Sequence, residues 1–262
     1  MIWGSDVKAS ELFEVANETV LVTGGASGIG LAMARALAGN GARVFIADID
    51  APAIEAALTE LSGLPGAVSC LVADVTDEAA MRGAFDRIEA EAGPVSVLVN
   101  NAGIVHRDKA ARMPRAAFKA VMDVNLEGAF FAAQETAARL IAAKRGGSII
   151  NISSILAQQP VRQVVAYGMA KAAMSQMTRT LALEWAKHGI RVNEIRPGWF
   201  DTRLTHRFFE GAAAAILAAQ TPLKRLGGES DLDGAVLFLA SQASAYVTGA
   251  SITVDGGHSL GR

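Results

Sequence analysis

Cysteine is nearly absent from this sequence, and so are long apolar runs. A single cysteine, Cys70, among 262 residues excludes a disulfide framework within the chain. Cys70 lies in an apolar run, which favours a buried small side chain over a reactive thiol. No apolar run reaches the roughly 20 residues of a membrane span. The first eight residues lack the charged start and apolar core of a signal peptide, so we expect a cytoplasmic protein.

Charge of one sign is also scarce. The 24 Lys and Arg residues and the 26 Asp and Glu residues leave a net charge of −2. This balance gives no electrostatic reason to expect nucleic acid or a membrane surface as a partner. No cluster of His, Cys and Asp has the spacing of metal ligands, so we expect no metal. The expected partner is a small-molecule substrate.

Short apolar runs alternate with longer, Ala-rich helical stretches along the chain. The expected strands are residues 20–22, 42–47, 67–73, 95–99, 148–152, 190–195 and 251–254. The expected helices are residues 29–37, 52–61, 77–92, 114–144 with an interruption near 123–125, 164–187 and 232–241. This alternation predicts an α/β fold with a parallel sheet covered on both faces. No linker interrupts it, so we expect one domain over residues 1–262, with an N-terminal arm at 1–17.

A glycine-rich turn, Thr23–Gly30, joins the first strand to the first long helix. Its glycines allow the backbone to approach a ligand closely, and the helix N-terminus offers N–H groups and a partial positive charge to a phosphate. The spacing Gly24-x-x-x-Gly28-x-Gly30 differs from the common Gly-x-Gly-x-x-Gly fingerprint. The strand and helix around the turn favour a dinucleotide site over a turn without a ligand.

Polar residues follow several of the expected strands. Asp48 ends the second strand, where an acidic residue of a dinucleotide fold accepts hydrogen bonds from the adenosine ribose. The alternative for Asp48 is a solvated carboxylate at a strand end. Asp74 ends the third strand, where it could lie beside the adenine, and the segment 100–103 follows the fourth. Since the carboxyl ends of parallel strands meet at one edge, we expect these residues to share a site.

Tyr167 and Lys171 lie four residues apart on an expected helix and therefore share a face. An ammonium beside a phenol favours the phenolate, and one close lysine together with the positive charge of an oxidised nicotinamide could lower the pKa of Tyr167 toward neutrality. Such a pair by itself is common on helix surfaces. Here Ser153 and Ser154 end the preceding strand, so hydroxyls, phenol and ammonium are expected to converge.

These motifs, in this order, resemble those of the classical short-chain dehydrogenase/reductases over nearly the whole chain. The matching segments are 23–30, Asp74, 100–103, Asn125, 151–154, 167–171, 191–193, Pro197, Gly198 and 255–257. The resemblance implies a doubly wound Rossmann fold with a seven-stranded, mostly parallel sheet, and a nicotinamide cofactor.

The resemblance also implies a role for each matching residue. Tyr167 would be the acid/base, Ser154 would bind the substrate oxygen, and Lys171 would bind the nicotinamide ribose. Asn125 would hold a water that continues the proton path. The implied catalytic residues are Asn125, Ser154, Tyr167 and Lys171. The implied cofactor-binding residues are Gly24, Ser27, Gly28, Ile29, Gly30, Asp48, Asp74, Val75, Asn101, Ala102, Gly103, Tyr167, Lys171, Pro197, Gly198 and Thr202.

The segment 198–228 is expected to cover the substrate. Residues 199–210 are rich in aromatic and basic side chains, and the alternative is an amphipathic helix packed on the core. The residues expected to contact substrate are His106, Gln159, Arg162, Trp199, Arg203 and His206. A lining of this kind favours a small polar substrate, such as a polyol, sugar or hydroxy acid.

We therefore predict an NAD-dependent oxidoreductase acting on a secondary alcohol or ketone. The nearest alternative is an NADPH-dependent 3-oxoacyl-thioester reductase. The residues after Asp48 disfavour it, because Ile49 and Asp50 offer no basic side chain to bind a 2′-phosphate. A non-catalytic, nucleotide-sensing Rossmann protein is the alternative of another class, which the intact catalytic set disfavours. The helical segments 127–143 and 172–186 are too apolar for fully solvated faces, and with the resemblance they predict a homotetramer.

Overall fold

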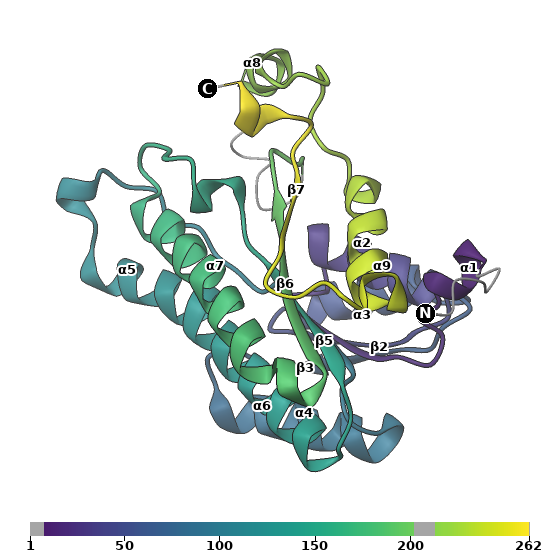
Figure 1. Cartoon of the computed structure of the whole chain (residues 1–262). Coiled ribbons are helices and arrows are strands. Elements are labelled where there is room, and N and C mark those ends of the chain that lie inside the picture. The colour runs from purple at the N-terminus through teal and green to yellow at the C-terminus, as the bar shows by residue number, and fades with distance from the viewer. Residues whose placement is uncertain (1–7, 202–212, 262) are drawn as a thin grey trace.

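Seven short strands pair into one parallel sheet in the part of the chain that the structure describes. The structure is a computed structural model that describes residues 8–201 and 213–261 (Figure 1). The strands are β1 Thr19–Thr23, β2 Arg43–Asp48, β3 Val68–Val72, β4 Val97–Asn100, β5 Gly147–Ile152, β6 Ile190–Pro197 and β7 Ser251–Val254. Their order is β3-β2-β1-β4-β5-β6-β7, with every neighbouring pair parallel. This confirms the predicted α/β fold, with the change of direction between β1 and β4 where ligands bind such sheets.

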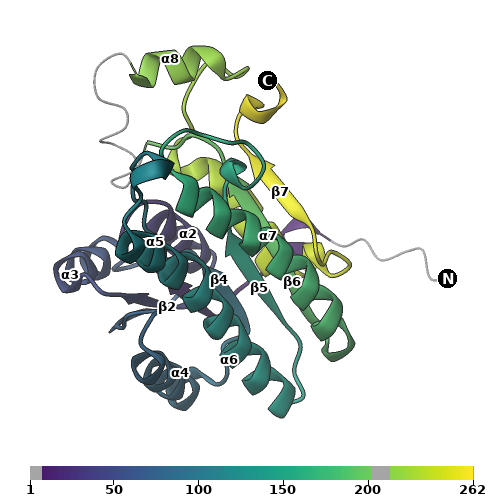
Figure 2. The ribbon, with the colours of Figure 1, turned by 90° about the vertical axis from the view of Figure 1, so that its left-hand side faces the viewer.

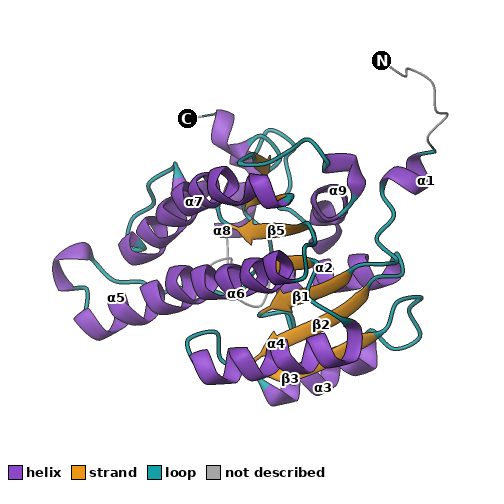
Figure 3. Ribbon diagram, turned by 60° about the horizontal axis from the view of Figure 1, so that its bottom comes forward, coloured by secondary structure: helices purple, strands orange, loops and turns teal. Residues whose placement is uncertain are grey.

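Helices cover both faces because consecutive strand residues point to opposite sides. Val20 and Val22 of β1 join a core with α2 (Gly28–Gly39), α3 (Ala51–Glu60) and α9 (Asp233–Ala240). Leu21, between them, joins a second core with α4 (Glu78–Ala92), α6 (Gly128–Ala142) and α7 (Val165–Trp185). Figure 2 shows α6 and α7 crossing in front of the sheet, and Figure 3 shows the strands enclosed by helices. Two short helices, α1 (Ala9–Leu12) and α8 (Ala213–Gln220), lie outside these layers (Figure 1).

Side-chain caps define where two helices begin. The Asp50 carboxylate accepts from the Ala53 N–H at 3.1 Å and starts α3, whose first turn contains Pro52. Asp77 accepts from the Ala80 N–H at 3.0 Å and starts α4, as the sequence predicts. No helix among residues 8–201 and 213–261 is long and apolar enough to cross a membrane.

The interruption predicted in the long helical stretch is a π-helical turn, Asp123–Glu127, between α5 (Arg115–Met122) and α6. It leaves the carbonyl of Val121 available to a side chain, and Asn125 Nδ2 donates to it at 2.8 Å. The same amide donates to the Ile104 carbonyl at 2.9 Å. The turn therefore fixes Asn125, which is fully buried, next to the loop that follows β4.

Candidate active site

The glycine turn between β1 and α2 forms a cradle that side chains would fill. Gly24 and Gly28 have φ of +61° and +54°, in the left-handed region that favours glycine. A Cβ on Gly24 would lie 2.8 Å from Ala102 Cα, and one on Gly30 would lie 2.4 Å from the Gly24 carbonyl oxygen. Ser27, the N-cap of α2, makes no capping hydrogen bond with its side chain. The tight turn and the helix N-terminus without a side-chain cap fit a bound diphosphate.

Thr23 and Asn101 hold this cradle against the end of β4. Thr23 Oγ1 accepts from the N–H groups of Asn101 and Ala102 at 3.1 and 3.2 Å. Asn101 Nδ2 donates back to the carbonyls of Thr23 and Gly24 at 3.1 and 2.8 Å. Thr23 was not among the predicted site residues, although a hydroxyl between an apolar strand and its glycine turn is a recognisable signal.

Asp48 lies beside the glycine turn at the end of β2. Its Oδ2 accepts from the Ala26 N–H at 3.1 Å and its Oδ1 from the Asp50 N–H at 3.1 Å. The half-buried carboxylate is thus held at the rim of the cradle. Arg43, at the opposite end of the strand, donates to the Glu91 carbonyl at 3.0 Å and does not face Asp48.

Asp74 and Val75 follow β3 at the same edge of the sheet. Asp74 is exposed, and its Oδ1 accepts from the N–H and Oγ1 of Thr76, both at 2.8 Å. Val75 is half-buried against α6, where a Cβ on Gly128 would lie 2.9 Å from Val75 Cγ2. The ends of β1 to β4 therefore present the predicted nucleotide-binding residues along one edge.

The hydroxyl, phenol and ammonium predicted to converge come from β5 and α7. Ser154, two residues after β5, is buried and hydrogen-bonds the Tyr167 hydroxyl. Lys171, one turn beyond Tyr167 on α7, donates from Nζ to the Ile152 carbonyl at 2.7 Å. Its Nζ lies 5.6 Å from the centre of the Tyr167 ring. Ser154 Oγ also accepts from the Leu156 N–H at 3.1 Å, which orients the hydroxyl.

The side chains of this chain do not by themselves produce the lowered Tyr167 pKa that Lys171 and an oxidised nicotinamide together are expected to give. Desolvation raises the pKa of Tyr167 to about 12, and the hydrogen bond with Ser154 opposes this increase. The Lys171 ammonium does not reverse it, because Nζ is directed to the Ile152 carbonyl. Burial lowers the pKa of Lys171 to about 8, against the opposing charge of Glu194. The pair is therefore a neutral phenol beside an ammonium that loses its proton readily.

The raised pKa of Tyr167 predicts a tyrosine ionisation at about pH 12. Because the folded-state pKa of Tyr167 is raised, its contribution to stability is complete below a pH of about 10 and is lost as the pH rises toward 12. Absorbance of the nucleotide-free protein near 295 nm should show this step, and the Tyr167→Phe variant should lack it. The chain's other tyrosine, Tyr246, is fully exposed, and Tyr246→Phe is the control that should keep the step. A difference between the unmodified protein and Tyr167→Phe that is confined to pH values near about 10 would contradict the burial argument.

Asn125 presents a buried acceptor toward the same site. Its Oδ1 has no hydrogen-bond partner among the described residues, although its amide nitrogen is fully used. A Cβ on Gly103 would lie 2.6 Å from this oxygen, so the loop after β4 requires glycine there. The structure does not test the predicted water. A buried oxygen without a donor is nonetheless a suitable place for one.

The residues predicted to contact substrate are distributed around this edge. His106 is half-buried in the loop after β4, and Arg162 is exposed. Gln159 Nε2 donates to the Ser259 carbonyl at 3.0 Å, and Trp199 Nε1 donates to His258 Nε2 at 3.0 Å. Gln159 and Trp199 are thus joined to the C-terminal segment. The predicted residues Thr202, Arg203 and His206 lie outside the described residues.

The end of β6 completes the edge. Pro197 is buried, and a Cβ on Gly198 would lie 2.5 Å from Asp255 Cβ, so the chain passes closely under the segment after β7. Within the described ranges, no group of three or more His, Cys, Asp or Glu side chains could hold a metal ion. Cys70 is partly buried and desolvation raises its pKa to about 11, which disfavours a reactive thiolate.

Known proteins resemble this chain over most of its length. The family model described as enoyl-(acyl carrier protein) reductase matches residues 24–259. Galactitol 2-dehydrogenase (L-tagatose-forming) from Cereibacter sphaeroides is 40% identical, over 95% of this chain and 98% of its own. A 3-oxoacyl-(acyl-carrier-protein) reductase from Thermotoga maritima is 38% identical, over 90% and 96%. The crystal structure of a gluconate 5-dehydrogenase from Burkholderia cenocepacia in complex with NADP and tartrate is 35% identical with a TM-score of 0.91, over 97% and 99%. The chain therefore belongs to the short-chain dehydrogenase/reductase family of oxidoreductases.

Proposed function

We propose that this protein transfers a hydride between NAD(H) and a secondary alcohol or ketone of a small polar substrate, a polyol, sugar or hydroxy acid. The observation that carries the proposal is the contact between the Ser154 hydroxyl and the Tyr167 phenol, with Lys171 one helical turn away. Ser154 lies just after β5, at the edge of the sheet that also carries the glycine turn, and Tyr167 and Lys171 come from α7. The protein would act as one dinucleotide-binding and catalytic domain, with residues 198–228 over the substrate.

The nucleotide would lie along the carboxyl edge of the sheet. The glycine turn from Gly24 to Gly30 would hold its diphosphate and Asp48 its adenosine ribose, with Asp74 and Val75 near the adenine. Tyr167 and Lys171 would hold the second ribose, with Asn101 to Gly103, Pro197, Gly198 and Thr202 around the nicotinamide. When bound, the nicotinamide accepts or supplies the hydride.

The residues of the chain would donate or accept the proton of the substrate oxygen. The hydroxyls of Ser154 and Tyr167 would hydrogen-bond the substrate oxygen and stabilise its alkoxide character in the transition state. With a pKa of about 12, Tyr167 is protonated at neutral pH and suited to donate a proton during ketone reduction. For alcohol oxidation the phenol must lose its proton, and a positively charged nicotinamide nearby would favour this.

The polar side chains near the site support a hydrophilic substrate. His106, Gln159 and Trp199 supply imidazole, amide and indole groups around the ends of β4, β5 and β6. Two of the three relatives named above are dehydrogenases of a sugar alcohol and a sugar acid. A long acyl chain would instead need an apolar slot, since its burial stabilises binding by about 25 cal/mol per Å².

The competing proposal is an NADPH-dependent reductase of 3-oxoacyl thioesters, the activity printed for the Thermotoga relative. The two proposals differ in both substrate and nucleotide. Purified protein should therefore be assayed at 340 nm with NAD+ and NADP+ against galactitol, D-gluconate and aryl alcohols, and in reverse with an acetoacetyl thioester. Faster turnover of a polyol or hydroxy acid supports the proposal, whereas a clear preference for the thioester would replace it with the alternative.

We also propose that the protein is a homotetramer. Phe131 on α6 is 49% exposed and Leu183 on α7 is 83% exposed, so both helices present large apolar side chains to the surroundings. A second copy of the same helices would cover them. Light scattering at micromolar concentration should give a mass near four times 27.2 kDa. A monomer mass would reject the proposal, and Phe131→Glu should lower the mass if the contact is on α6.

A further inference from the structure

Two charged residues are buried inside β6. Glu194 and Arg196 are two residues apart on the face of the strand that α7 covers, and their side chains are 1% and 7% exposed. Arg196 Nη2 lies 2.5 Å from Glu194 Oε1. Removing two charges from water costs several kcal/mol for each ion. A buried pair of this kind is therefore weak evidence for stability and invites a search for another role.

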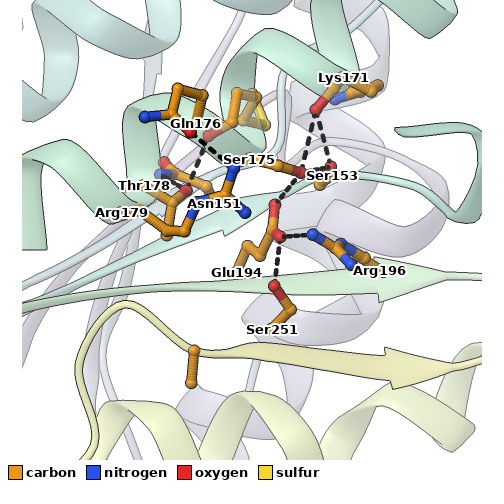
Figure 4. A network of polar contacts seen from close by, with 12 residues as sticks. Asn151, Ser153, Lys171, Ser175, Gln176, Thr178, Arg179, Glu194, Arg196 and Ser251 are labelled. Carbon is orange, nitrogen blue, oxygen red and sulfur yellow. Dashed lines mark hydrogen bonds and ion pairs between the residues drawn. The ribbon is translucent and has the colours of Figure 1, made fainter. Parts of the chain in front are cut away.

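The Glu194 carboxylate is fully engaged in hydrogen bonds. Ser175 of α7 donates from its Oγ to Oε2 at 2.8 Å, and Ser251 of β7 donates from its Oγ to Oε1 at 2.5 Å. Together with Arg196, these donors surround the carboxylate from three elements (Figure 4). A carboxylate with this many donors is fixed in position.

One of these donors also contacts Lys171. Ser175 Oγ lies 3.2 Å from the Lys171 carbonyl oxygen and 3.4 Å from Ser153 Oγ. Ser153 Oγ in turn lies 3.2 Å from the same carbonyl oxygen (Figure 4). Since the short contact with Glu194 takes the single proton of Ser175, the Ser153 proton must be shared between the Lys171 carbonyl and Ser175 Oγ in a three-centre hydrogen bond. Ser153 thus joins the backbone of Lys171 to Ser175, and Ser175 joins it to Glu194.

The charge of Glu194 also acts on the Lys171 side chain. Burial lowers the pKa of Lys171 to about 8, and the Coulomb attraction of Glu194 raises it. Arg196 opposes this attraction, but it pairs with Oε1, on the Ser251 side of the carboxylate, whereas Oε2 faces α7.

Among residues 8–201 and 213–261, the other elements around α7 place no charged group against Lys171 that competes with Glu194. Strands β5 and β7 and the turn Ile155–Ala157 contain no titratable residue, and Tyr167 is neutral. The remaining charged side chains of α5 and the π-helical turn are exposed or half-exposed: Arg115, Lys119, Asp123 and Glu127. Glu194 is therefore the anion best placed to retain the ammonium.

We propose that Glu194 is a positioning residue for Lys171: its carboxylate holds the Lys171 backbone through Ser175 and Ser153 and supplies a buried negative charge on that side of α7. This inference rests on the proposed function, in which Lys171 binds the nicotinamide ribose as a cation. Glu194 touches neither substrate nor nucleotide in this scheme, so it acts only through Lys171.

The charge is tested by Glu194→Gln, which retains the shape of the side chain. Loss of the anion should make Lys171 release its proton more easily. The pH above which alcohol oxidation declines should then fall by about one unit relative to the unmodified protein. Nucleotide affinity can be measured by tryptophan fluorescence at a series of pH values, which gives a readout that does not depend on turnover. In the variant, this affinity should also begin to decline at a pH about one unit lower than in the unmodified protein.

The connection through Ser175 is tested by a matched pair of variants that leave every charge in place. Ser175→Ala and Ser251→Ala each remove one hydroxyl from Glu194, but only Ser175 also contacts Lys171. Ser175→Ala should weaken nucleotide binding about fivefold, and Ser251→Ala by less than about twofold. If Glu194→Gln does not fold, the two serine variants still test whether Glu194 acts on Lys171 through Ser175.

Each outcome bears on one proposal. An unmodified protein that turns over substrate, together with a folded Glu194→Gln variant of unchanged pH profile, would overturn the role of Glu194 and leave the proposed function intact. Equal effects of the two serine variants would overturn the connection. An unmodified protein that binds nucleotide without any turnover would refute the proposed function, and its binding profile would still test Glu194.

Discussion

Replacing Tyr167 with Phe is expected to lower turnover at least about a hundredfold, the usual scale for a general acid/base. The substitution removes only the hydroxyl that contacts Ser154. The ring remains on α7, so packing and the position of Lys171 should persist. Nucleotide affinity should therefore change little while turnover falls.

The other tyrosine supplies the control. Tyr246 is fully exposed and lies outside the site, so Tyr246→Phe makes the same chemical change without removing a reacting group. Initial rates at 340 nm, with NAD+ and the best substrate of the panel, compare the two variants. Turnover of Tyr167→Phe within a few-fold of that of Tyr246→Phe would remove Tyr167 from the mechanism.

NAD(H) is expected to be preferred over NADP(H) by at least about tenfold in catalytic efficiency because of Asp48. Its carboxylate lies at the rim of the glycine turn, 3.1 Å from the Ala26 nitrogen. A 2′-phosphate there would repel it by roughly 4 kcal/mol for each unit charge at about 4 Å and an effective dielectric near 20. Screening by water and salt could reduce this repulsion to about a quarter. Summed over the phosphate charge, the remaining energy still lowers the affinity for NADP(H) more than about tenfold. One relative of similar fold was crystallised with NADP, so the family alone does not determine which nucleotide this protein prefers. Measuring the preference therefore tests the role of Asp48.

Asp48→Ser should narrow this preference, because it weakens the contact with the ribose and relieves the repulsion of the phosphate. Asp77→Ser is the matched control, since it removes a carboxylate that caps α4 and leaves a residue that can still cap. Values of kcat/KM for both nucleotides with one substrate measure the effect. Equal use of the two nucleotides by the unmodified protein would show that Asp48 does not contact the ribose as proposed.

The sheet and its helices could be predicted because local signals agree with the tertiary structure. Val20 to Val22 form a strand buried on both faces, and such strands are apolar throughout. Asp77 could be placed at the start of α4 from its position before a helical pattern. Some predicted helix boundaries differ from those of the structure by a few residues. The helix α7, for example, was expected to reach Lys187 but ends at Trp185.

The electrostatics of the site could not be predicted in the same way. A spacing of four residues places Tyr167 and Lys171 on one face, but it does not specify that Lys171 Nζ donates to the Ile152 carbonyl. Desolvation therefore dominates the Tyr167 pKa, and Lys171 alone does not lower it. Glu194 and Arg196 left a signal in the sequence that was not used, because charged residues are unusual in a strand that lies inside a sheet. Their partners Ser175 and Ser251 come from elements distant in sequence and appear only in the folded protein.

Transfer of deuterium tests hydride transfer at this site most directly. The protein would be incubated with NAD+ and a polyol or hydroxy acid that carries deuterium on its carbinol carbons. The mass of the reduced nucleotide would then be measured by mass spectrometry. We expect reduced nucleotide that is one mass unit heavier with the unmodified protein, and at least about a hundredfold less of it with Tyr167→Phe. Absence of labelled nucleotide with every alcohol of the panel, or equal labelling by both proteins, would contradict the account.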